Sequence, residues 1–141
     1  MQVEHAILIH AAAAAVYRRY EDVATWHTWD PDTKRASLDG PVAVGTRGTL
    51  TPTRGNTVRM TITELVIDRR FTVEARIPGL RMVFDHDLEP EGNAVRVTHR
   101  VRFSGVLSFL IGRVLQRQLD RNLPVTLASL RRTVEAQPTS P

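Results

Sequence analysis

Three histidines stand at positions where an imidazole could transfer a proton or bind a metal ion. His5, His86 and His99 each take the place of an apolar residue in a segment that alternates between apolar and polar side chains, as a half-buried β-strand does. His86 and His99 flank residues 89–93 (EPEGN), a sequence typical of a hairpin loop, so we expect them to be opposite or diagonal neighbours. Inward-facing histidines can act as general acids or bases near neutral pH.

Two other interpretations of these histidines are open. Each could be a partly buried side chain that makes a single hydrogen bond and has no chemical role. Three imidazoles on one wall could also hold a metal ion. We expect no metal site, because no pair of histidines or carboxylates shows the helical ligand spacing of known metal-binding motifs.

Other reactive groups and cofactor motifs are missing from the sequence. There is no cysteine, which excludes disulfides, thiolate catalysis and cysteine-ligated metal centres. Residues 45–48 (GTRG) lack the spacing and the Lys-Ser/Thr pair of a phosphate-binding loop. No serine lies in a nucleophile elbow. We therefore expect neither a nucleotide nor another cofactor.

Composition favours one soluble domain. A chain of 141 residues with 42% hydrophobic and 24% charged residues is ordinary for a globular protein, and we assign residues 1–136 to a single domain with a disordered tail at 137–141. The net charge of +4 comes almost entirely from arginine, but the arginines are dispersed among acids, so we expect no nucleic-acid binding. Neither a signal peptide nor a membrane span is evident, which predicts a cytoplasmic protein without stable membrane insertion.

The sequence pattern predicts a series of strands, with two short helices after the first, followed by one long helix. Alternation and turn residues predict strands at 3–9, 35–39, 46–53, 57–67, 71–77, 80–88 and 94–103, with short helices at 10–20 and 22–32. Short hairpin connections favour an antiparallel sheet with one buried face. Asp85 and Asp87 fall on the opposite face, where we expect them to be solvated partners of arginines.

Residues 106–136 predict a helix that covers this sheet. Apolar residues recur three and four apart from Leu107 through Leu110, Val114 and onward to Val134, which predicts one buried stripe about 45 Å long. Pro124 lies inside the helix, and we expect a kink near residues 120–123.

This order and several local phrases resemble the START/Bet v 1-like (SRPBCC) superfamily, specifically bacterial proteins of the polyketide cyclase/dehydrase and lipid transport type. The resemblance spans about residues 2–135 and rests on the first strand that enters residues 11–16, the Trp26–Trp29–Asp30 phrase, residues 45–48, the hairpin between residues 84 and 100, and residues 103–105 before the long helix.

The resemblance implies an α+β helix-grip fold. In it, a curved antiparallel sheet of about seven strands wraps round the long C-terminal helix, two short helices follow the first strand, and a cavity lies between sheet and helix. The first strand would lie beside the last, so that His5 joins His86 and His99 on the concave wall. Members bind lipids, polyketides and similar molecules, some catalyse cyclisation and dehydration, and no catalytic motif is common to all.

The primary functional hypothesis is binding or transport of a small hydrophobic ligand in that cavity. The alternative is a cyclase/dehydratase without metal or nucleotide cofactor, in which His86 and His99 transfer protons. A third hypothesis is a protein partner on the outer face of the sheet. The oligomeric state would be monomer or homodimer. The residues expected to contact the ligand are His5, Trp26, Trp29, Met60, Met82, Phe84, His86, His99, Phe103, Leu115, Leu119 and Leu123.

Overall fold

A computed structural model describes residues 1–136, so the tail expected at 137–141 lies outside the described residues. One antiparallel seven-stranded sheet has the strand order β1-β7-β6-β5-β4-β3-β2. The elements are β1 (Gln2–Ile9), α1 (Ala13–Glu21), the 3₁₀ helix η1 (Val23–Thr28), β2 (Thr33–Leu38), β3 (Arg47–Pro52), β4 (Val58–Val66), β5 (Arg70–Ile77), β6 (Leu80–Glu91), β7 (Ala94–Ser104) and α2 (Leu107–Glu135). The predicted helix-grip architecture is confirmed.

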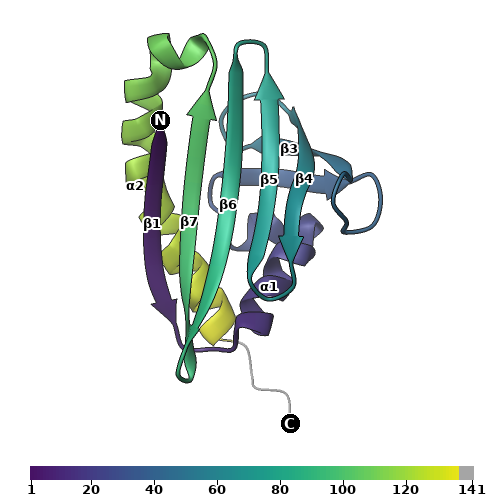
Figure 1. Ribbon diagram of the computed structural model, residues 1–141, viewed down its shortest axis with the longest axis vertical. Helices are drawn as coiled ribbons and strands as arrows, with labels where there is room; N and C mark the ends of the chain where they lie inside the picture. Colours follow the sequence, from purple (N-terminus) through teal and green to yellow (C-terminus); the bar gives the residue numbers. More distant parts are fainter. Residues whose placement is uncertain (137–141) are drawn as a thin grey trace.

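The helices divide the inner face of the sheet between them (Figure 1). The long helix α2 packs on β1 and β7, α1 contacts β5 and β6, and η1 packs against β2 at the other edge. No helix within residues 1–136 combines the length and the hydropathy needed to cross a bilayer.

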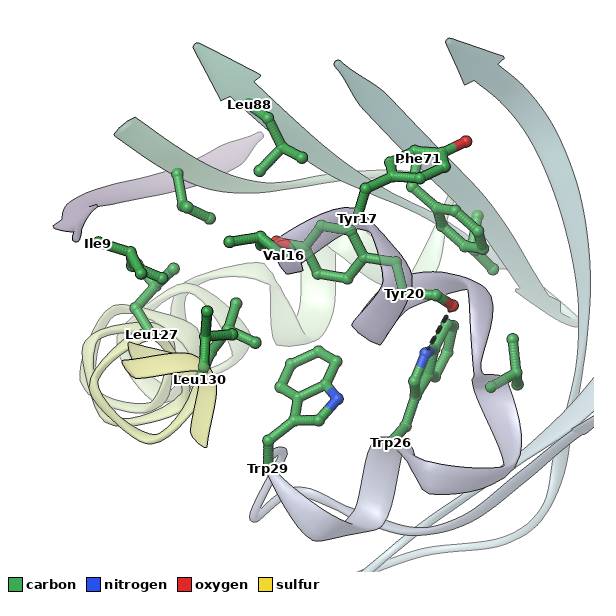
Figure 2. Packing of buried hydrophobic residues seen from close by; sticks show 14 of the residues in the cluster. Ile9, Val16, Tyr17, Tyr20, Trp26, Trp29, Phe71, Leu88, Leu127 and Leu130 are labelled. Atoms are coloured by element: carbon green, nitrogen blue, oxygen red, sulfur yellow. Dashed lines mark hydrogen bonds between the residues drawn. The ribbon is translucent and has the colours of Figure 1, made fainter. Parts of the chain in front are cut away.

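The main core lies where these helices meet. Tyr20, Phe71, Leu127 and Leu130 are almost completely buried, and Tyr20 packs at its centre beside Phe71 and Trp29 (Figure 2). A smaller cluster forms between the sheet and the first half of α2, from Val3, Leu80, Val101, Phe103 and Leu123, with Met82, Phe84, Leu107, Leu115 and Leu119 partly buried around it. Aromatic side chains bury large apolar areas, and most of the buried aromatic residues belong to the main core. The main core therefore stabilises the fold more than the smaller cluster does.

The two halves of α2 differ in burial. From Leu123 to Val134 the apolar stripe is buried as predicted. In the first half, Leu110 and Val114 are exposed, so the prediction of one continuous buried stripe is wrong there. The helix is continuous through Pro124, and the kink expected there stays a prediction.

Two local features of the sheet differ from the sequence-based expectation. The loop expected at residues 89–93 is a tight turn, because β6 extends to Glu91 and β7 begins at Ala94. Asp85 points to the outer face as expected, but it is buried beneath Arg100 and Arg102 and accepts hydrogen bonds from both, as well as from Thr72. Long arginine side chains thus cover part of the sheet that alternation alone predicts to be open.

Candidate functional site

A small cavity lies between η1 and the inner face of the sheet. Its volume is about 70 Å³, and its walls come from η1 and the turn after it, from β2, β3, β5 and β6. The lining residues are Trp26, Trp29, Asp30, Thr33, Leu50, Val73, Ala75, Phe84 and His86. No residue of α2 lines this cavity, so its place differs from that of the cavity expected beneath the C-terminal helix.

His86 and His99 are direct cross-strand partners in the β6–β7 hairpin. Their ring centroids are 4.7 Å apart and the rings are nearly perpendicular. The tight turn at the end of β6 sets the pairing register of the hairpin. A shift of one residue in this register would move one imidazole to the outer face. The expected proximity of the two imidazoles is therefore observed.

The hydrogen bond of His86 fixes its tautomer. Its Nδ1 lies 2.7 Å from the carbonyl oxygen of Phe71, which can only accept, so Nδ1 carries the hydrogen and donates. In the neutral ring, Nε2 then holds a free lone pair. Within residues 1–136 this nitrogen makes no hydrogen bond, and the side chain lines the cavity. His86 can thus accept a proton or a hydrogen bond from a molecule in the cavity.

His99 lies behind His86 and is tied to α1. Its Nε2 is 2.8 Å from the hydroxyl oxygen of Tyr20, and both side chains are buried. The hydroxyl makes no other hydrogen bond within the described part of the chain, so its polar contact is with His99. Burial raises the pKa of Tyr20 well above its usual value, which keeps the phenol protonated.

Burial also keeps both imidazoles neutral. Desolvation lowers the pKa of His86, although the Phe71 carbonyl partly opposes this effect. Desolvation lowers the pKa of His99 further, and the neighbouring His86 adds to the decrease. At pH 7 the site therefore presents neutral rings, which can accept protons.

These lowered pKa values predict acid sensitivity of the fold. Below pH about 6.5, the ordinary histidine pKa, the unfolded chain binds protons that the folded chain does not, so the free energy of unfolding falls as pH falls. For each of the two histidines, the free energy of unfolding falls by at most about 1.4 kcal/mol for each unit by which the pH is lowered. We expect urea unfolding at pH 7.5 and 5.5 to show a decrease of about 2 kcal/mol.

The matched control for this experiment is the His86→Gln/His99→Gln double variant, which keeps hydrogen-bonding side chains at both positions but removes both titrations. Its unfolding free energy should change less between the two pH values. Asp30 and the surface carboxylates are unchanged in the variant, so the difference between the curves belongs to the histidines. Parallel curves would contradict the assignment.

The two tryptophans beside the cavity differ in one respect. The indole N–H of Trp26 donates to the carbonyl oxygen of Tyr20 at 3.0 Å (Figure 2). The indole N–H of Trp29 is buried and is the one buried side-chain polar atom in residues 1–136 without a hydrogen-bond partner. In Figure 2 this nitrogen lies on the side of its ring toward Trp26. Such a donor costs about 1–3 kcal/mol when nothing accepts from it.

Asp30 brings a carboxyl group to the same cavity. It accepts hydrogen bonds from the Thr33 hydroxyl and the Asp32 backbone N–H, both at 2.9 Å. Burial nevertheless raises its pKa above the usual carboxyl value. A half-buried carboxyl group and a neutral imidazole therefore line one small space, which is an arrangement that acid–base chemistry uses.

The remaining predicted ligand contacts lie elsewhere. His5 is the β1 partner of His99, but its Nε2 contacts the Asp120 carboxylate on α2 at 2.6 Å. Met60 is buried in the main core and Phe103 in the smaller cluster, whereas Met82 is only half buried there. Leu115, Leu119 and Leu123 also belong to the smaller cluster. Of the predicted contacts, the structure places four at the cavity: Trp26, Trp29, Phe84 and His86.

Two residues of the site were missing from the sequence-based prediction. Tyr20 could have been identified as a residue whose hydroxyl needs a partner, because it lies on the apolar edge of the first helix. Asp30 follows η1, and the carboxyl of such a residue usually faces solvent. Among residues 1–136 no three histidine, aspartate or glutamate side chains gather closely enough to hold a metal ion.

The chain was compared with protein families and with curated proteins. Residues 1–135 match the family model described as polyketide cyclase/dehydrase and lipid transport. No curated protein matches the chain.

Solved structures share the fold at low sequence identity. TTHA0849 from Thermus thermophilus is 19% identical, with a TM-score of 0.77 and coverage of 96% of this chain and 98% of that one. The di-domain ARO/CYC protein BexL from the BE-7585A biosynthetic pathway is 24% identical, with a TM-score of 0.78, and the match covers 96% of this chain and 46% of BexL. Norcoclaurine synthase from Thalictrum flavum is 12% identical, with a TM-score of 0.72 and coverage of 97% and 87%. These matches support the fold alone.

Proposed function

Because the chain belongs to the polyketide cyclase/dehydrase and lipid transport family, we propose that it binds a small hydrophobic molecule in the cavity between η1 and the sheet. The observation that carries the proposal is the unpaired indole N–H of Trp29, a residue that lines the cavity. In the free protein no hydrogen bond offsets the desolvation cost of this N–H. A ligand oxygen that accepts from it would do so.

The size of the cavity limits how such a ligand enters. Drug-sized ligands occupy pockets of about 300–1,000 Å³, so the observed 70 Å³ holds only one end of such a molecule unless side chains move. Phe84 is the natural side chain to move, because it lines the cavity and is only half buried. It also touches the smaller cluster, whose partly buried members Met82, Leu115 and Leu119 offer an apolar surface for the rest of the molecule.

The second candidate function is proton-transfer catalysis at the same site. The free lone pair of His86 Nε2 favours it, since a neutral imidazole can remove a proton next to a ligand carbonyl. Trp29 N–H would then stabilise the oxygen that gains negative charge, and the imidazolium of His86 would return the proton that it removed. His99 would pack against the ring of His86 without contacting the ligand.

Native mass spectrometry of gently purified protein tests the proposal. We expect a bound small molecule of low polarity that carries at least one oxygen. Its identity after prolonged incubation separates the two functions: a binding protein returns the molecule unchanged, and an enzyme returns a product that the His86→Gln variant does not form. Protein that stays free of ligand, and that binds no member of a panel of phenols, naphthols and fatty acids, would contradict both.

A further inference from the structure

The first half of α2 carries an apolar surface that the domain does not cover. Val106, Phe109, Leu110 and Val114 have relative exposures of 72%, 88%, 80% and 67%. Single exposed apolar residues are common on proteins, but four within nine residues at the start of one helix form a continuous patch of the kind that binds a partner.

The orientation of this half of the helix is fixed by its inner side. Gly112 is buried against Met1 and Phe103, and a Cβ atom at this position would lie 2.5 Å from the sulfur of Met1. Leu115 and Leu119 also turn inward, toward the smaller cluster. Leu110 and Val114 are therefore held outward, and rotation of the helix to bury them would break this contact.

Three arginines share the outward side. Arg113, Arg117 and Arg121 follow one another at intervals of four residues, which places them along one helix face beside Leu110 and Val114. All three are exposed, and none forms an ion pair or hydrogen bond with any residue between 1 and 136. The nearest acid on the helix, Asp120, contacts His5 instead. Like charges at this spacing repel one another, so binding of an external anion would reduce the repulsion between the three guanidinium groups.

We propose that this surface, formed by Val106, Phe109, Leu110 and Val114 with Arg113, Arg117 and Arg121, docks on an anionic lipid membrane. The apolar side chains would enter the boundary between headgroups and acyl chains, and the guanidinium groups would bind lipid phosphates. Because the second half of α2 is anchored in the main core, the helix lies on the membrane and does not cross it. This inference is independent of the ligand proposed for the cavity.

The combination of apolar and positively charged side chains favours a membrane over a nucleic acid or a second copy of the chain. A nucleic acid would pair with the arginines but leave Phe109 and Leu110 in water. A second copy packed through the same surface would bring the arginines of both chains together without neutralising them. An anionic bilayer satisfies both kinds of side chain at once.

Co-sedimentation with vesicles tests the proposal. We expect the protein to bind vesicles of phosphatidylcholine mixed with phosphatidylglycerol, to bind less in high salt, and to bind phosphatidylcholine vesicles weakly. Since each arginine near an anionic surface contributes about fivefold in affinity, the Arg113→Gln/Arg117→Gln/Arg121→Gln variant should lose about 100-fold. The Phe109→Ser/Leu110→Ser variant should lose at least about tenfold.

Matched controls lie on the same helix. Val125→Ser removes an apolar side chain that is 55% exposed, and Arg131→Gln/Arg132→Gln removes two positive charges beyond the docking surface. Both should bind as the wild type does, and all variants should unfold at the wild-type temperature because the substituted side chains are exposed. Equal binding to neutral vesicles, no binding to either composition, or a concentration-dependent dimer that the Phe109→Ser/Leu110→Ser variant abolishes would each overturn the proposal.

Discussion

Replacing Trp29 with phenylalanine should weaken ligand binding about tenfold, because it removes the one buried side-chain donor in residues 1–136 that has no partner in the free protein. The phenyl ring keeps most of the apolar contact with Tyr20, whose ring lies 5.9 Å from the indole. The loss should therefore come from the missing hydrogen bond to the ligand oxygen. Calorimetric titration of the co-purified molecule into ligand-free protein measures it.

Trp26→Phe is the matched control. It removes an indole from the wall of the same cavity, but the N–H of Trp26 already donates to the carbonyl of Tyr20. This variant should lose stability by about 1–3 kcal/mol, because the Tyr20 carbonyl is left unpaired. Its ligand affinity should fall less than that of Trp29→Phe. Equal losses of affinity in both variants would show that the indoles act by shape alone, and the oxygen-acceptor hypothesis would be wrong.

The alternation of the strands was enough to predict an antiparallel sheet and the central pair of histidines, whereas the helix-grip arrangement was implied by the family resemblance. In a strand, every second residue faces the same side, so the apolar neighbours of His86 and His99 indicate that both imidazoles face inward. His5 obeys the same rule, and it is indeed the β1 neighbour of His99. Alternation cannot show where a long side chain ends, however, and the ring of His5 turns to Asp120 on the helix.

Periodicity was less informative for the long helix. Leu107 to Val134 has one apolar repeat, but a repeat specifies only that a face is apolar and does not specify what covers it. In the structure the second half of α2 belongs to the main core with residues of the sheet and the short helices, whereas only the inner side of the first half packs against the smaller cluster. Leu110 and Val114 are therefore exposed although they fit the repeat.

The cavity itself could not be predicted from spacing. Its wall combines residues from η1 and four strands that are distant in sequence, and its location depends on how η1 packs on the sheet. Trp29 was expected at the site as an aromatic residue. That its N–H has no partner depends on every neighbouring backbone carbonyl, which only a three-dimensional structure defines.

Replacing Gly105 with alanine should have the largest effect on stability, because this residue joins the sheet to α2. Its φ is +110°, where L-residues are strained, and a Cβ atom would lie 2.4 Å from the carbonyl oxygen of Gly79. That carbonyl accepts the Leu107 N–H at 2.9 Å, so its displacement would also break the contact that starts the helix. We expect the free energy of unfolding in urea to fall by about 3 kcal/mol.

Gly92→Ala separates backbone strain from steric conflict. Gly92 also has a positive φ, +60°, but nothing lies within 4 Å of the position that a Cβ atom would take, so alanine there should cost only about 1 kcal/mol. If the two variants lose the same stability, the contact between Gly105 and Gly79 does not hold the helix in place. If Gly105→Ala is far more destabilising, the first turn of α2 is positioned by this contact, and with it the direction in which Phe109 and Leu110 project.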